Sequence, residues 1–287
     1  MAEIDLSAGT IEYTDTGGDG PVLVFIHGVM VGPSEWRRVV AELSGEYRCV
    51  LPHLPLGSHP RPMRPDADLS LAGLASLIGE FLEKLDLRDV TLVQNDWGGA
   101  QVLVAHGGAE RVARMVLVAC EAFDNYPPGL AGRVLTKTAA IPGGLAVFAQ
   151  LLRFRAARRA PGGWGWMTKR PVPDEVMDEW FRPAREQAAV RRDLERYGRG
   201  LPPREVLLEW AERNSSFTGP VLVVWAEEDR VMPAEHGRRL AALYPRGRLV
   251  TIPDSYTLVP EDQPEALTAA IRGFLAETSV SGPAAAN

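Results

Sequence analysis

Short apolar runs alternate along this chain with longer segments in which apolar residues recur every three or four positions. Continuous apolar runs are typical of central strands in a parallel sheet, which are covered on both faces. They predict strands at 22–26, 48–51, 90–93, 115–119, 221–225 and 248–252. Two stretches nearer the N-terminus, 4–6 and 10–14, flank a glycine turn and predict an antiparallel edge.

The periodic segments predict amphipathic helices between these strands. The clearest covers 70–85, and others are predicted after Pro33-Ser34 and at 98–106, 234–243 and 264–276. Because strands and helices alternate, we predict an α/β fold with a mostly parallel, doubly wound sheet and right-handed crossovers.

The pattern changes over residues 122–212, which hold many Pro, Gly, Trp and Arg residues, several short helical patterns and no convincing strand. We predict that this segment is a helical cap, or lid, inserted into the core. The core then comprises a first part, 1–121, and a second part, 213–277. The last residues, 278–287, are small and polar and are predicted to form a disordered tail.

Composition narrows the possible partners. A chain of 287 residues, 46% of them hydrophobic, is long enough for one large core with an insertion. Its formal charge of −6 gives no electrostatic footprint for nucleic acid or for an anionic membrane surface. We interpret the basic stretch 153–159 as a solvated helix face. A small-molecule substrate fits this balance best.

Cellular location and cofactors are inferred from what the sequence lacks. Cys49 and Cys120 lie in apolar runs and are expected to be packed thiols. The sequence shows neither a signal-peptide pattern nor eighteen consecutive apolar residues, so we expect a cytoplasmic monomer or homodimer. His and Cys are too scattered for a metal site, and no phosphate-binding glycine loop is present, so we expect no cofactor.

The most informative motif is Asn95-Asp96-Trp97-Gly98-Gly99, directly after the predicted strand at 90–93. A residue on such a strand-to-helix turn projects from the carboxyl edge of the sheet, and the small residues after it let the backbone turn back. The pattern predicts a nucleophile elbow with Asp96 in the nucleophile's place. A plain helix cap is the alternative role for this carboxylate.

The order of these parts, together with His27-Gly28 after one strand and the segments 225–229 and 253–257, resembles the α/β-hydrolase superfamily over residues 10–276. Asp followed by Trp-Gly is similar to the branch of haloalkane dehalogenases and epoxide hydrolases. The resemblance implies that Asp96 attacks a saturated carbon bearing a halide or an epoxide oxygen and forms an ester. Water activated by a histidine then hydrolyses that ester.

The resemblance also implies roles for other residues. Trp97 would offer its indole N–H, and the backbone N–H groups of Trp97 and Val29 would complete a cluster of donors for the leaving group. Asp229 matches the superfamily's commonest acid position and is the preferred choice. Glu121 follows the strand 115–119, where some dehalogenases carry their acid. A turn residue is the alternative reading of Asp229.

The chain departs from this family at the general base, because Thr257 stands in the histidine's position with Tyr256 beside it. Neither hydroxyl is an effective base at neutral pH. His27, His53 and His59 flank loops expected at the carboxyl edge of the sheet, where one of them would have to replace the base. The family role implied for His27 is structural.

The loop after His27-Gly28 favours neither substrate class. Dehalogenases often carry Asn there and epoxide hydrolases an aromatic residue and Pro, whereas this chain has Val29-Met30. Epoxide hydrolases also use two lid tyrosines, and Tyr126 and Tyr197 are the lid tyrosines available.

Three functions follow from these patterns. The favoured one is an Asp-nucleophile hydrolase with haloalkane dehalogenase-like or epoxide hydrolase-like chemistry on a small, mainly apolar substrate. The second is an acid–base enzyme that uses Asp96 for an elimination, cyclisation or rearrangement. The third is a non-catalytic small-molecule binding protein.

Overall fold

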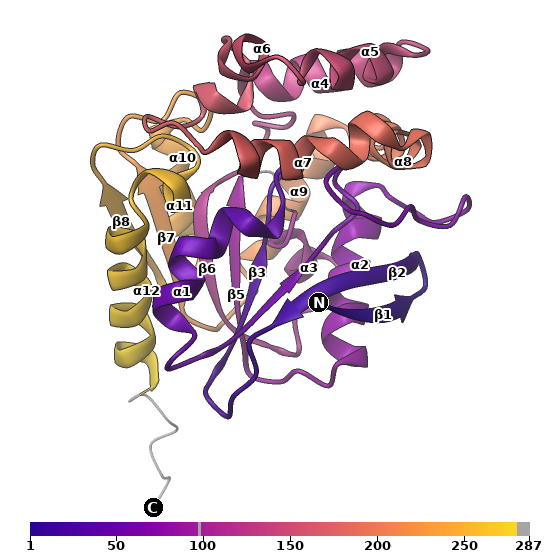
Figure 1. Cartoon of the computed structure of the whole chain (residues 1–287). Coiled ribbons are helices and arrows are strands. Elements are labelled where there is room, and N and C mark those ends of the chain that lie inside the picture. The colour runs from indigo at the N-terminus through magenta and orange to yellow at the C-terminus, as the bar shows by residue number, and fades with distance from the viewer. Residues whose placement is uncertain (97–98, 280–287) are drawn as a thin grey trace, which may run out of the picture.

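The computed structural model describes residues 1–96 and 99–279, and its centre is an eight-stranded sheet. The strand order is β1-β2-β4-β3-β5-β6-β7-β8 (Figure 1). The strands are β1 (Ala2–Leu6), β2 (Gly9–Asp15), β3 (Val22–Ile26), β4 (Arg48–Pro52), β5 (Val90–Asp96), β6 (Val112–Cys120), β7 (Val221–Ala226) and β8 (Gly247–Ile252). Both pairings of β2, with β1 and with β4, are antiparallel, and the remaining pairings are parallel. The predicted α/β class is therefore confirmed.

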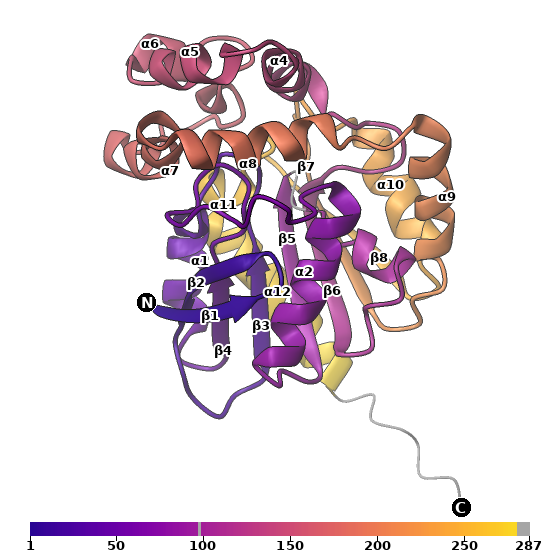
Figure 2. The ribbon, with the colours of Figure 1, turned by 90° about the vertical axis from the view of Figure 1, so that its right-hand side faces the viewer.

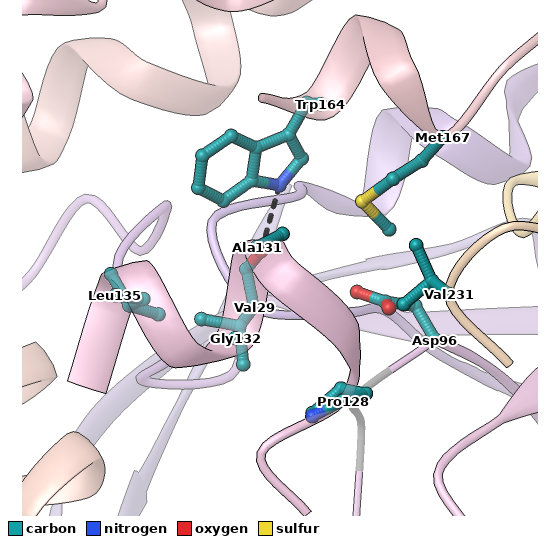
Figure 3. A pocket seen from close by; sticks show the side chains of 9 residues that line it. All are labelled: Val29, Asp96, Pro128, Ala131, Gly132, Leu135, Trp164, Met167 and Val231. Carbon is teal, nitrogen blue, oxygen red and sulfur yellow. Dashed lines mark hydrogen bonds between the residues drawn. The ribbon is translucent and has the colours of Figure 1, made fainter. Parts of the chain in front are cut away.

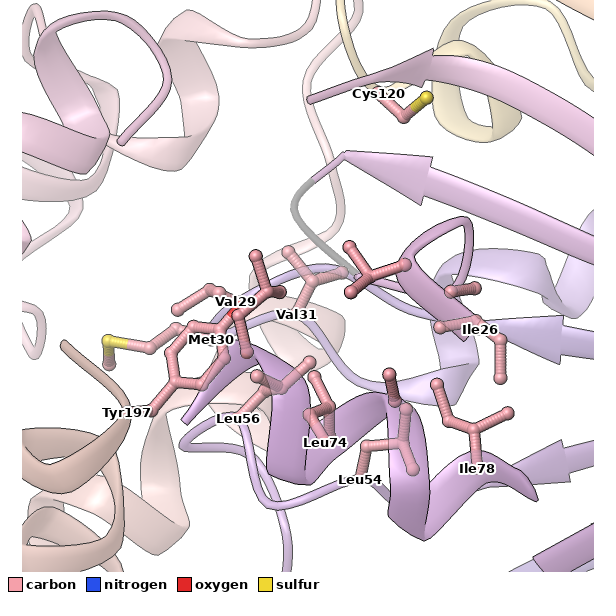
Figure 4. Packing of buried hydrophobic residues seen from close by; sticks show 14 of the residues in the cluster. Ile26, Val29, Met30, Val31, Leu54, Leu56, Leu74, Ile78, Cys120 and Tyr197 are labelled. Carbon is pink, nitrogen blue, oxygen red and sulfur yellow. The ribbon is translucent and has the colours of Figure 1, made fainter. Parts of the chain in front are cut away.

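Two apolar cores lie on opposite faces of this sheet, since successive side chains of a strand point to opposite sides. Phe25 on β3 belongs to the core that includes α1 (Arg37–Leu43) and α12 (Pro264–Ser279). Its neighbour Ile26 belongs to the other core, which Figure 4 shows in part. That second core includes α2 (Leu71–Lys84), α3 (Val102–Ala105) and α10 (Ala234–Leu243).

The predicted helix at 70–85 corresponds to α2, whose first turn is capped by Ser70. The Ser70 hydroxyl accepts a hydrogen bond from the backbone N–H of Gly73 at 3.1 Å. A serine in this position satisfies one of the N–H groups that the first turn leaves without an intrahelical partner.

Two boundaries differ from their predictions. The elbow helix was expected at 98–106, but α3 begins at Val102 after a turn, and residues 97–98 lie outside the described part. The tail was expected from 278, but α12 continues to Ser279. Its end is held by Arg114, whose Nε donates to the Thr278 hydroxyl at 2.8 Å. The rest of the predicted tail, 280–287, also lies outside the described residues.

The segment predicted as a lid contains helices and no strand between residues 121 and 220, all of which are described. These helices are α4 (Gly129–Ala140), α5 (Gly144–Leu151), α6 (Arg155–Arg159), η2 (Trp164–Trp166), α7 (Asp174–Glu186), α8 (Ala188–Arg199) and α9 (Arg204–Asn214). Figures 1 and 2 show α7 and α8 over one edge of the sheet, with α4, α5 and α6 as a further layer above them. By contrast, α9 packs against α3 beside the sheet.

The helices of the described part are all too short or too polar to cross a lipid bilayer. The two cysteines are buried and unpaired by disulfides, which confirms the prediction of packed thiols.

Candidate active site

Asp96 is the last residue of β5, and its backbone has a φ of 55°. This left-handed region is strained for residues other than glycine, although Asp and Asn tolerate it best. The residue is only 4% exposed and reaches a small cavity beneath the lid. Figure 3 shows its carboxylate pointing into that cavity. The strained turn therefore presents a buried carboxylate at the carboxyl edge of the sheet.

Apolar groups form the other walls of the cavity. They come from the loop after β3, from α4 and the residue preceding it, from η2 and the residue after it, and from the loop after β7. The residues are Val29, Pro128, Ala131, Gly132, Leu135, Trp164, Met167 and Val231. Trp164 Nε1 donates to the Val29 carbonyl oxygen at 3.1 Å and ties the lid to the β3 loop. Such a cavity suits a small apolar molecule.

Gly28 permits the close approach between the β3 loop and the elbow. A Cβ atom at this position would lie 2.2 Å from Asp96 Oδ2. Real Cβ atoms do not approach an oxygen so closely, so no other residue fits without a shift of Asp96 or of the loop. The backbone around Gly28 therefore forms one wall beside the carboxylate.

Thr257 is fully buried in the loop after β8 and pairs with Asp229. Its hydroxyl donates to Asp229 Oδ1 at 2.7 Å. The same oxygen accepts the backbone N–H groups of Val231 and Met232 at 2.8 and 2.9 Å, whereas the buried Oδ2 has no hydrogen-bond partner among the described residues. Burial raises the pKa of Asp229 to about 6. Asp229 is thus the carboxylate that contacts Thr257.

Asn95 links this pair to the elbow. Its Nδ2 donates to the Thr257 carbonyl oxygen at 2.9 Å and to that of Val118 at 2.8 Å. The residue preceding Asp96 therefore fixes the loop that carries Thr257. Asn95, Thr257 and Asp229 therefore form one hydrogen-bonded chain that begins beside Asp96.

Glu121 takes a different place from Asp229. Its Oε1 accepts the backbone N–H of Gly99 and its Oε2 the side-chain amide of Gln94, both at 2.8 Å. Burial raises the pKa of Glu121 to about 8. Glu121 therefore braces both sides of the elbow, and no hydrogen bond joins it to Thr257 in the described part of the chain.

Histidine does not line the Asp96 cavity within the described residues. His27 Nδ1 lies 2.9 Å from the Gly28 carbonyl oxygen, and its Nε2 accepts the backbone N–H of Leu54 at 3.0 Å. Burial lowers the pKa of His27 to about 3, so the ring is neutral and holds two loops together. This geometry agrees with the structural role implied by the resemblance.

The other two histidines near the sheet edge are also placed away from the cavity. His59 accepts the Gly57 N–H at Nδ1, and its Nε2 lies 3.2 Å from Asp193 Oδ2. The His53 ring packs edge-on against His27, with ring centroids 6.5 Å apart. Burial lowers the pKa of His53 to about 4.

Some of the predicted substrate-binding residues line the Asp96 cavity, and others do not. Val29 lines the cavity, whereas Met30 is buried in the apolar core and donates its backbone N–H to the Leu56 carbonyl oxygen at 2.7 Å. The Tyr256 ring packs against the Arg230 guanidinium, 4.0 Å from the ring centroid, and does not line the cavity. Trp97 lies outside the described residues.

The two lid tyrosines meet each other. The hydroxyl of Tyr126 lies 2.8 Å from that of Tyr197. Burial, with smaller contributions from Tyr126, Glu121 and Asp96, raises the pKa of Tyr197 well above its ordinary value. Tyr126 also lines a small neighbouring cavity that includes Glu121. Spacing in the sequence did not predict that these two hydroxyls would be in contact.

Glu35 is a buried carboxyl group that no motif had indicated. It lies in η1 (Pro33–Trp36), is 1% exposed, and has no hydrogen bond to either oxygen among the described residues. Burial raises the pKa of Glu35 well above its ordinary value, and the charges of Asp96 and Glu261 add to this shift. Its position four residues before Val39, on the buried face of the predicted helix, was the available signal.

Comparison with known proteins agrees with this arrangement of parts. The sequence matches the alpha/beta hydrolase family over residues 23–270, and the chain belongs to that family. It is 29% identical over 274 residues to "haloalkane dehalogenase 2" of Mycobacterium tuberculosis, covering 93% of this chain and 92% of that protein. A haloalkane dehalogenase of Mesorhizobium japonicum is 32% identical over 122 residues, which are 42% of this chain and 38% of that protein.

Solved structures share the fold. The haloalkane dehalogenase DbeA of Bradyrhizobium elkani has a TM-score of 0.77 at 18% identity, covering 98% of this chain and 99% of that one. An alpha/beta hydrolase fold protein of Burkholderia ambifaria has a TM-score of 0.73 at 26% identity, covering 94% and 96%. The chain is therefore an α/β-hydrolase with haloalkane dehalogenase-like relatives.

Replacing Gly28 tests the close approach at the elbow. Gly28→Ala is expected to lower the free energy of unfolding by about 1–3 kcal/mol, because the new Cβ overlaps the Asp96 carboxylate. Urea denaturation measures this loss. Gly45→Ala is the matched control, since a Cβ at Gly45 meets no atom within 4 Å. Equal stability of the two variants would contradict the geometry.

Glu35→Gln tests the buried carboxyl group. Above about pH 4.5, the ordinary pKa of glutamate, Glu35 loses its proton in the unfolded chain. In the folded chain Glu35 retains the proton to a higher pH, because its pKa is raised there. The stability that this residue contributes therefore falls as pH rises, by at most about 1.4 kcal/mol per pH unit. Glutamine is always neutral, so the variant should gain stability relative to the wild type as the pH rises above about 5.

Denaturant unfolding across that range measures the difference, with the exposed Glu83→Gln as control. A constant difference between Glu35→Gln and the wild type at all pH values would show that Glu35 ionises normally.

Proposed function

We propose that this protein is an Asp-nucleophile enzyme that acts on small, mainly apolar haloalkanes. An Asp96 carboxylate oxygen attacks the carbon that bears the halogen, the new carbon–oxygen bond gives an ester, and the halide leaves with the bonding electrons. The observation that carries this proposal is a buried carboxylate at a strained elbow, facing a cavity whose other walls are apolar. The haloalkane dehalogenases among the relatives support the same substrate class.

Hydrolysis of this ester is the second half of the reaction, and this chain lacks a histidine at the position of the base. Hydrolysis of the ester needs a group that accepts a proton from water, and a threonine hydroxyl does not do so at neutral pH. The Thr257 hydroxyl donates a hydrogen bond to Asp229, and this side chain has no basic atom. We therefore infer that the ester on Asp96 is hydrolysed slowly and that the alkylated protein accumulates.

Epoxides are a second candidate substrate class, favoured by the contact between the Tyr126 and Tyr197 hydroxyls. When Asp96 attacks a ring carbon, the carbon–oxygen bond of the ring breaks and an alkoxide develops. For a tyrosine O–H to transfer its proton to that oxygen, the substrate has to extend from the Asp96 cavity to Tyr126, which lines the neighbouring cavity. The second hydroxyl then supports the phenolate that remains. The raised pKa of Tyr197 keeps this hydroxyl protonated before the reaction.

Intact-protein mass spectrometry after incubation with a bromoalkane or an epoxide tests the proposal. We expect a stable adduct because the base is absent. A haloalkane adds its alkyl group and loses hydrogen halide, whereas an epoxide adds its whole mass, so the mass increase identifies the chemistry.

Asp96→Asn is the control for this adduct, since asparagine tolerates the left-handed backbone but is a far weaker nucleophile. Loss of the adduct in this variant supports the proposal. If the wild-type protein shows neither adduct nor product, the proposal is wrong. Acid–base chemistry at Asp96 or ligand binding without turnover would then be the better assignment.

Thr257→His is expected to restore the missing step. Among the described residues, Asp229 has one buried oxygen without a partner, and its other oxygen accepts a hydrogen bond from residue 257, so it is suited to orient an imidazole. Ester hydrolysis should accelerate by about 10²–10⁴-fold, the usual contribution of a general base. Single-turnover decay of the adduct measures this rate. An adduct equally long-lived in both proteins would contradict the role assigned to Thr257.

A further inference from the structure

The outermost helices of the lid expose large apolar side chains. Apart from Met1, every exposed large hydrophobic residue in the described part of the chain lies between residues 130 and 154. These residues are Leu130, Ile141, Val147, Leu151 and Phe154, which are 46–63% exposed. Scattered exposed hydrophobic residues are common, but their concentration on neighbouring helices indicates a binding surface.

The helix α5 shows why this surface is unusual. Leu145 and Ala149 lie on its inner face and are buried against the rest of the lid. Val147 and Leu151 follow the same spacing of four on the outer face and are exposed. Phe154, at the start of α6, is exposed as well. A helix that is apolar on both faces is normally covered on both.

The charge of this region is opposite to that of the whole chain. Between Asp124 and Asp174 the sequence has no acidic residue and eight Lys or Arg residues, whereas the chain as a whole carries −6. The side chains of Arg133, Lys137 and Arg153 are exposed and form no ion pair in the described part of the chain. The neighbouring Arg155 and Arg158 instead pair with acidic residues on α7.

We propose that the outer face of α4, α5 and α6 docks on an anionic lipid bilayer. The exposed side chains of Val147, Leu151 and Phe154 enter the boundary between headgroups and acyl chains. The basic side chains that form no ion pair contact the lipid phosphates. This occupant matches both features of the surface, apolar side chains and positive charge. A second copy of this chain fits less well, since a twofold contact through this face brings like charges together.

The net charge of the whole chain gave no reason to expect binding to a membrane surface, because it averages this basic face with an acidic remainder.

The proposed contact with the bilayer also lies close to the cavity. On α4, Leu130 and Arg133 face outward, while Ala131, Gly132 and Leu135 line the cavity over Asp96. Docking therefore brings the wall of the cavity close to the phase in which apolar molecules concentrate.

An environment-sensitive dye on an introduced thiol tests the docking directly. Both native cysteines are buried, so labelling of Val147→Cys directs the dye to the lid. With vesicles of phosphatidylcholine and phosphatidylglycerol, we expect a blue-shifted emission and binding at least about tenfold tighter than to phosphatidylcholine alone. Arg246→Cys, at the opposite edge of the sheet, carries the control dye and should show no shift.

Vesicle sedimentation of the full chain separates the two contributions. Leu151→Ser with Phe154→Ser should weaken binding by more than about tenfold, and Arg153→Glu by about fivefold or more. Arg246→Glu, which changes the net charge equally, should have little effect. No binding to anionic vesicles overturns the proposal, as does equal weakening by Arg246→Glu. If the lid variants instead abolish self-association or capture of an acidic protein, this face is a protein interface and the proposal is also wrong.

Discussion

The whole site depends on the contact between the Asp96 carboxylate and the backbone of Gly28. Strands β3 and β5 are paired in parallel, with Ile26 opposite Gln94, so the two loops that follow them emerge side by side. The left-handed turn at Asp96 then places its carboxylate where only a glycine leaves room. The cavity and the lid that closes it are arranged around this one carboxylate.

Three further buried carboxyl groups surround the elbow, and burial raises the pKa of Glu35, Glu121 and Asp229. At neutral pH the pKa of about 8 keeps Glu121 mostly protonated, whereas Asp229, with a pKa of about 6, is mostly ionised. Asp229 and Thr257 keep the arrangement of an acid and its partner, although the partner has no basic atom. Under the proposed mechanism, this pair provides no base for hydrolysis of the ester on Asp96.

Much of this was predictable because it depends on local patterns. Continuous apolar runs predicted the central strands, and the motif at Asp96 predicted the turn that its backbone adopts. The burial of Glu35 and the meeting of Tyr126 with Tyr197 depend on how distant segments pack, which spacing does not encode. Tyr256 was placed beside the site by sequence adjacency, yet its ring packs against Arg230.

The most direct test of the central claim is to locate the covalent adduct. After reaction with a bromoalkane, the protein would be cleaved by a protease at low pH to preserve the ester, and the modified peptide sequenced by tandem mass spectrometry. The account predicts that the alkyl group is attached to Asp96. Attachment to another residue, such as Glu121 or His53, would contradict the assignment of Asp96 as the nucleophile.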